Sequence, residues 1–224
     1  MVFYHAAAGE DMGRVIHVDP LKPSESAINS IADVVRNGGV IVYPTDTIYG
    51  LGCLGRNSAS VSRILGIKSR EQSRGFLLLI PDMNWVSTLT SEVPGAFYRL
   101  AAKFWPGTVT FLLPANPNLP ASIRGTRGLV GLRQPDCPYL GRVMKAIPGP
   151  LLSTSANISG QNTPPSVAEL KQLLLDEVDL FVDGGEVLDP MPSTVVDLSV
   201  TPPQVVRPGR LGPRIEQLLA AFER

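Results

Sequence analysis

The stretch that decides the fold of this chain is Pro150-Leu151-Leu152-Ser153-Thr154-Ser155-Ala156-Asn157-Ile158-Ser159-Gly160. A short apolar run leads into small hydroxyl and carboxamide side chains and then stops at a glycine. This pattern predicts a buried strand that ends in a turn rich in hydrogen-bonding groups. Such a turn can hold phosphate, carboxylate or ribose, because it offers many donors at low steric cost. The alternative interpretation is a serine-rich surface turn without a ligand.

Short apolar runs alternate with amphipathic segments on both sides of this stretch. An edge strand is predicted at 14–18, and further strands at 40–43, 76–80, 110–113, 129–132, 180–182, 194–198 and 204–206. Helices are predicted at 24–37, 58–67, 94–104, 140–146, 166–175 and 213–222, with Ser24 and Ser166 as N-caps. A loop is predicted at 45–52, where polar residues run into glycines. We therefore expect one α/β domain at 24–224, after a lead-in at 1–23 and with no additional C-terminal domain.

Composition places the chain among globular proteins. Of its 224 residues, 44% are hydrophobic and 18% are charged, which is enough apolar content for a sizeable core. No apolar run approaches the roughly 20 residues that a membrane-spanning helix needs. The N-terminus lacks the basic and apolar regions of a secretory signal, and the two cysteines have no C-x-x-C spacing. These features predict a cytoplasmic protein without a membrane partner.

The positions of the histidines and of the charged residues limit the kinds of active site that the chain can form. The two histidines, His5 and His17, both lie in the lead-in, so the body has none for a Ser-His-Asp triad or a His/Cys zinc site. The net charge is zero, yet residues 56–74 hold five cationic side chains against one acid, and residues 116–135 hold three arginines and no acid. Each basic segment indicates either a local anion site or a solvated face.

Six motifs follow one another along the chain in an order that resembles a known family. They are Pro44-Thr45-Asp46-Thr47-Ile48-Tyr49-Gly50-Leu51-Gly52, Lys68-x-Arg70, Phe104-Trp105-Pro106-Gly107, Ser153-Thr154-Ser155-Ala156-Asn157, Ser193-Thr194-Val195-Val196-Asp197 and Arg207-Pro208-Gly209. Together they resemble the YrdC family of threonylcarbamoyl-AMP synthases, in its single-domain form. The resemblance implies a twisted mixed α/β sheet with flanking helices around a basic concave cleft.

The resemblance also implies a reaction. L-threonine, bicarbonate and ATP, with Mg²⁺, would give threonylcarbamoyl-AMP and pyrophosphate for the modification of tRNA position 37. A threonine N-carboxylate attacks the α-phosphorus, so fixed cations and donors are needed and a protein nucleophile is not. A body without histidine fits this chemistry. Proteins that transfer the threonylcarbamoyl group downstream, and tRNA or double-stranded RNA, are the expected macromolecular partners.

The family motifs assign roles to ten residues of this sequence. Lys68 and Arg70 are expected to be catalytic. The ATP-binding residues are expected to be Lys68, Arg70, Arg74, Ser155, Asn157 and Arg207. The L-threonine-binding residues are expected to be Thr47, Arg133, Ser153 and Ser193. We expect no protein side chain as a metal ligand, because phosphate oxygens and water hold most of a nucleotide-bound Mg²⁺.

Each of these residues also has a structural interpretation. Lys68 or Arg70 can be a charge that favours the C-terminus of a helix. Thr47 can be a turn residue, and Ser193 a strand-entry hydroxyl. Arg133 can be a salt-bridge partner of Asp136 or Asp197.

The sequence departs from the family pattern at two places that concern the nucleotide. Glu71 and the segment Arg74-Gly75-Phe76 replace the proline and the basic-Pro-Leu run that usually follow the K-x-R motif. Leu129 stands where the family often has a hydroxyl. The altered loop from Glu71 to Phe76 favours an alternative function, in which a non-catalytic paralogue binds double-stranded RNA or tRNA through the basic cleft. The intact K-x-R and S-x-N motifs favour the synthase.

Overall fold

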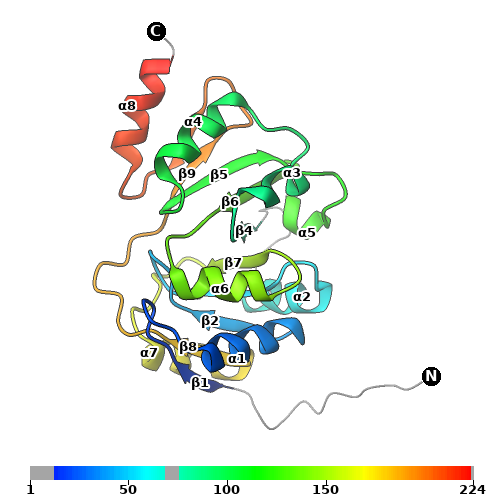
Figure 1. The fold of residues 1–224 in the computed structure, drawn as a ribbon, viewed down its shortest axis with the longest axis vertical. Coiled ribbons are helices and arrows are strands. Elements are labelled where there is room, and N and C mark those ends of the chain that lie inside the picture. Colours follow the sequence, from blue (N-terminus) through cyan, green and yellow to red (C-terminus); the bar gives the residue numbers. More distant parts are fainter. Residues whose placement is uncertain (1–12, 69–75, 223–224) are drawn as a thin grey trace, which may run out of the picture.

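In the part of the chain that a computed structural model describes, residues 13–68 and 76–222, ten strands form one twisted sheet with helices on both faces (Figure 1). The order across the sheet is β1-β8-β2-β3-β7-β4-β6-β5-β9-β10, and parallel and antiparallel neighbours are mixed. The strands are β1 (Arg14–His17), β2 (Ile41–Tyr43), β3 (Gly50–Leu54), β4 (Leu77–Leu79), β5 (Val109–Pro114), β6 (Leu129–Arg133), β7 (Leu151–Ser155), β8 (Leu180–Asp183), β9 (Thr194–Asp197) and β10 (Gln204–Arg207). The predicted fold class is confirmed.

Six of the α-helices in the described residues lie close to predicted segments, whereas the short helices α3 and α5 were not predicted. The helices are α1 (Glu25–Arg36), α2 (Ser58–Ile67), α3 (Val86–Leu89), α4 (Gly95–Phe104), α5 (Ala121–Arg124), α6 (Pro138–Ala146), α7 (Val167–Leu174) and α8 (Gly212–Phe222), with 3₁₀ helices η1 (Met83–Trp85) and η2 (Leu175–Glu177). Ser24 Oγ accepts from Ala27 N at 3.2 Å, and Ser166 Oγ accepts from Glu169 N at 3.4 Å, so both predicted N-caps are confirmed. No described helix is long and apolar enough to cross a membrane.

The prediction of a loop at 45–52 is wrong at its second half. Gly50 begins β3, which pairs with β2 on one side and with β7 on the other. The ring of Tyr43 packs across this strand, and a Cβ on Gly50 would lie 2.9 Å from Tyr43 Cζ. A Cβ on Gly52 would lie 2.5 Å from the carbonyl oxygen of Leu152. The glycines that resemble loop residues in the sequence are therefore strand residues that admit a tyrosine ring and a neighbouring backbone.

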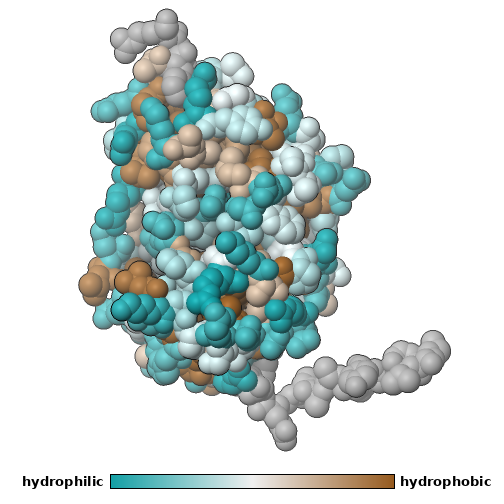
Figure 2. Space-filling model, in the orientation of Figure 1, coloured by the Kyte–Doolittle hydropathy of each residue, from teal (hydrophilic) through white to brown (hydrophobic). Residues whose placement is uncertain are grey.

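Two apolar clusters hold the layers together. On one face of the sheet, α2, α4, α7 and α8 bury side chains that include Ile64, Phe97, Leu170 and Ile215. On the other face, α1 and α6 cover the half formed by β1, β8, β2 and β3, with Ile31 and Val143 among the buried residues. Hydrophilic side chains predominate on the molecular surface in front of α1 and α6 (Figure 2). These helices are therefore amphipathic covers of the sheet.

Candidate functional site

A cavity of about 510 Å³ opens on the same sheet face as α1 and α6, over the part that these two helices leave uncovered. Its floor follows the two-residue periodicity of the strands, because alternate side chains point to the same face. Across neighbouring strands, Ser153 of β7 pairs with Leu77 of β4, which pairs with Gly131 of β6. Gly131 in turn pairs with Leu112 of β5. The apolar part of the floor consists of Leu77, Leu79, Leu112, Leu129, Gly131 and Val195. The volume suits a ligand of the size of a nucleotide.

Arg133 lies at the end of β6 and is 4% exposed at its side chain. Its Nε donates to the carbonyl oxygen of Gly107 at 3.0 Å, and its Nη1 donates to Thr47 Oγ1 at 3.1 Å. Its Nη2 donates to Asp46 Oδ1, and the second carboxylate oxygen of Asp46 accepts from Asp136 N at 3.1 Å. Burial lowers the pKa of Arg133, and the charge of Asp46 opposes that shift. Asp46 thus fixes the guanidinium at the edge of the cavity.

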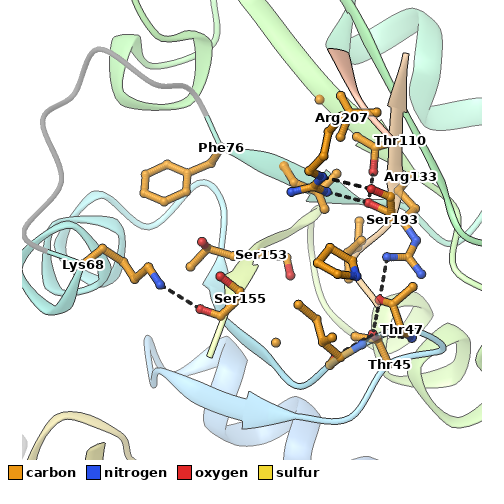
Figure 3. A pocket seen from close by; sticks show the side chains of 18 of the residues that line it. Thr45, Thr47, Lys68, Phe76, Thr110, Arg133, Ser153, Ser155, Ser193 and Arg207 are labelled. Carbon is orange, nitrogen blue, oxygen red and sulfur yellow. Dashed lines mark hydrogen bonds between the residues drawn. The ribbon is translucent and has the colours of Figure 1, made fainter. Parts of the chain in front are cut away.

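Arg207 lies beside Arg133 on the same side of the cavity (Figure 3). Its Nε and Nη2 donate to the carbonyl oxygen and to Oγ of Ser193, at 3.0 and 2.9 Å. Ser193 Oγ also lies 2.8 Å from Thr110 Oγ1. Burial lowers the pKa of Arg207, and repulsion by Arg133 lowers it further. Within the described residues Arg207 forms no ion pair, so an anionic ligand between the two arginines would offset their repulsion.

Lys68 lies on the opposite side of the cavity, beside the end of β7 (Figure 3). Its Nζ donates to the carbonyl oxygens of Ser155 and Asn157, at 3.0 and 2.6 Å, and to Asn157 Oδ1. Ser155 Oγ donates to the same amide oxygen at 2.6 Å. Lys68 is also the C-cap of α2, so the structural interpretation as a helix-terminal charge applies as well. The lysine therefore ties α2 to the turn in which β7 ends.

The structure brings together all the predicted site residues that it describes. These eight residues line the cavity: Thr47, Lys68, Arg133, Ser153, Ser155, Asn157, Ser193 and Arg207. Arg70 and Arg74 lie outside the described residues. The suggested pairing of Arg133 with Asp136 or Asp197 is wrong, because the partner is Asp46, which lies on the loop after β2. Asp197 instead pairs with Arg127 at 2.8 Å.

Sequence reasoning missed several cavity residues. Arg124 and Arg127 line the cavity from α5 and the turn before β6, and Thr110 lines it from β5. The signal that could have found the two arginines was the acid-free segment at 116–135, which the sequence left open between an anion site and a solvated face. Asp46 belongs to a quoted motif, but its pairing with Arg133 joins residues far apart in the chain.

Sequence comparison defines the family. Residues 33–209 match the family model for Sua5, YciO and YrdC proteins, whose description is "Telomere recombination". "Uncharacterized protein YciO" of Escherichia coli K12 is 35% identical over 200 residues, which are 88% of this chain and 96% of the relative. The threonylcarbamoyl-AMP synthase of Pseudoalteromonas translucida is 33% identical over 175 residues, which are 77% of this chain and 94% of the relative. The chain belongs to the Sua5/YciO/YrdC family.

Solved structures agree with this assignment. Pyrococcus abyssi Sua5 in complex with L-threonine superimposes with a TM-score of 0.86 at 30% identity, over 92% of this chain and 60% of the Sua5 chain. Escherichia coli YciO superimposes with a TM-score of 0.82 at 34% identity, over 89% of this chain and 97% of that chain. This chain therefore matches YciO over nearly its whole length, and somewhat more than half of Pyrococcus Sua5.

Proposed function

We propose that this protein is an L-threonylcarbamoyladenylate synthase that forms threonylcarbamoyl-AMP and pyrophosphate from L-threonine, bicarbonate and ATP. The observation that carries the proposal is the convergence of eight predicted site residues, from segments between Thr47 and Arg207, on one cavity with cationic groups at both ends. Relatives named threonylcarbamoyl-AMP synthase support this product, and a relative solved with L-threonine supports threonine as a substrate.

The proposed reaction is an acyl-adenylate formation. The amine of threonine and bicarbonate give a carbamate with loss of water. A carbamate oxygen then attacks the α-phosphorus of ATP, the bond to the β-phosphate oxygen breaks, and pyrophosphate leaves. Negative charge in the transition state lies on phosphate oxygens, so the side chains contribute position and charge and do not act as nucleophiles.

The two ends of the cavity suit the two substrates in this proposal. Arg133, Thr47 and Ser193 lie together at one end, where a guanidinium and two hydroxyls would hold the threonine carboxylate and hydroxyl. Lys68 and Ser155 lie at the other end, where the ammonium group would exchange a carbonyl oxygen for a phosphate oxygen. Arg207 would reach the nucleotide from the side of β10.

Mg²⁺ would enter with ATP under this proposal. Asp46 and Asp197 are each already bound to an arginine, and no cluster of three or more His, Cys, Asp or Glu side chains that could hold a metal occurs among the described residues. The residues present thus fit a cation that is held mainly by phosphate oxygens and water. When bound, the ion would neutralise charge on the triphosphate.

The test is pyrophosphate release by the purified protein with ATP and Mg²⁺. Release should require both L-threonine and bicarbonate, and a Lys68→Met variant should lose about 10²–10³-fold in rate, as for other lost transition-state donors. The matched control is Arg63→Gln on the same helix, because Arg63 pairs with Asp179 at 2.8 Å and is not among the described cavity residues. Its rate should stay unchanged.

A folded protein that releases no pyrophosphate above background would overturn the proposal. The alternative of an RNA-binding paralogue would then be examined by RNA binding at several salt concentrations. A steep loss of affinity with salt, without ATP turnover, would support that alternative, because phosphate contacts release counterions.

A further inference from the structure

Gly131 occupies the middle of the cavity floor. It lies in β6, with Leu77 of β4 opposite it on one side and Leu112 of β5 opposite it on the other. Leu129 and Arg133 lie two residues before and two residues after Gly131 on the same strand. All three positions therefore face the cavity. Gly131 thus lies between the arginine end of the cavity and its apolar part.

The described structure around Gly131 does not require a glycine. Its φ is outside the left-handed range that favours glycine. A Cβ at this position would lie 3.4 Å from Leu112 Cδ2, 3.5 Å from Thr110 Cγ2 and 3.6 Å from Leu77 Cα, which are ordinary contacts. Gly52 in β3 differs, because a Cβ there would meet a backbone oxygen at 2.5 Å.

A glycine inside a strand has an energetic cost. It loses more backbone entropy on folding than alanine does, and it contributes no side chain to packing. Gly131 carries this cost in a fully paired central strand, although its described neighbours would accept a methyl group. A strand glycine that packing does not demand often marks a place where a ligand approaches the backbone closely.

We infer that Gly131 is a specificity-determining residue that keeps the floor flat for the nucleotide. This inference rests on the proposed function. The planar base or ribose of ATP packs against the bare backbone at Gly131, between the side chains of Leu77 and Leu112. A side chain at this position would project into the cavity and lift the nucleotide away from the floor.

The experiment measures ATP and L-threonine binding by calorimetry, and thermal unfolding, for Gly131→Ala and Gly131→Val. The dissociation constant for ATP should rise by about threefold with alanine and by more than about tenfold with valine, because overpacking grows with side-chain volume. The affinity for L-threonine at the Arg133 end should stay within about twofold in Gly131→Ala. The melting temperature of Gly131→Ala should rise by about 1–4 °C.

The matched control is Gly141→Ala in α6. A Cβ at Gly141 would meet no heavy atom within 4 Å, and the residue is not among those that line the cavity in the described structure. This variant should gain a similar increase in melting temperature and bind ATP like the wild type. The inference is supported if both alanine variants gain stability but only Gly131→Ala binds ATP more weakly than the wild type.

Three results would contradict the inference, and they are distinguishable. If the wild type binds ATP and Gly131→Val binds it equally well, the floor does not contact the nucleotide and the inference is wrong, while the proposed function stands. If the wild type binds no ATP, the proposed function fails together with the inference. A Gly131→Ala variant that is less stable than the wild type would show that packing requires the glycine, and would also overturn the inference.

Discussion

Two halves of one sheet face have opposite characters. Where α1 and α6 cover the sheet, the strands present Ile41, Tyr43, Leu180 and Val182 to a closed apolar cluster. Where the cover ends, the same face carries hydroxyls and guanidinium groups around the cavity. The change takes place within one strand, because β7 places Leu151 under the helices and Ser153 in the cavity.

The boundary between the halves is a hydrogen bond. Tyr43, which belongs to the covered half, donates from its hydroxyl to Ser153 Oγ at 2.6 Å. The apolar ring thus closes the core while its polar end meets the first polar residue of the cavity. The two halves belong to one continuous sheet, so the position of α1 and α6 decides which part of this face is open to a ligand. The following substitutions test this division, beginning with the largest expected effect.

Arg133→Ala should cost about 3–5 kcal/mol of unfolding free energy, because it leaves the carboxylate of Asp46, which is only 12% exposed, without its cation. Urea unfolding measures this cost, and calorimetry should show the loss of L-threonine binding. In an Asp46→Asn background the same substitution should cost much less stability, because no unpaired charge then stays buried. An equal cost in both backgrounds would show that the ion pair is not the source of the effect.

Ile31→Ala and Leu112→Ala compare the two halves directly. Ile31 of α1 is fully buried in the covered half, so its truncation should cost about 3 kcal/mol and leave ATP affinity unchanged. Leu112 is partly exposed in the cavity floor, so its truncation should cost about 1 kcal/mol and weaken ATP binding. Urea unfolding and calorimetry give both values. A loss of ATP affinity in Ile31→Ala, from protein that is still folded, would contradict the division.

The unfolding free energy of the protein should also fall at alkaline pH, because ionisable groups are buried in the covered half. Burial raises the pKa of Cys137 to about 12, and it raises the pKa values of Tyr43 and Tyr139 as well. A folded-state pKa above the unfolded value gives stability that is complete below about pH 9 and is lost as the pH rises toward 12. Each such group contributes at most about 1.4 kcal/mol per pH unit to this decline.

Unfolding free energies of the wild type and Cys137→Ala between pH 8 and 11 test this prediction. The variant should start from a lower value, because it loses buried volume, and should then decline less steeply with pH. The slope is the decisive quantity, since a purely structural effect of the substitution would shift the whole curve. Equal slopes in the two proteins would mean that the thiol of Cys137 ionises alike in the folded and unfolded states.

The sequence alone predicted most of the strands and helices and most of their bounds, but not β3, α3 and α5. Helix α2 at Ser58–Ile67 and the caps at Ser24 and Ser166 were predictable, because helix periodicity and capping depend on neighbours within a few residues. The eight predicted residues that line the cavity were identified from the family resemblance and not from their spacing.

Tertiary structure alone decided the rest. Residues 50–54 form a strand because Tyr43 and β7 pack against their glycines, and local propensity does not contain that information. Asp46 and Arg133 are 87 residues apart in the chain. The fold brings the loop after β2 to the end of β6, although three strands lie between β2 and β6 in the sheet. The division of the sheet face into a covered core and an open cavity depends on where α1 and α6 end in space. Only long-range packing fixes that boundary, which is why the sequence predicted eight residues that line the cavity and the fold decided the shape of the cavity.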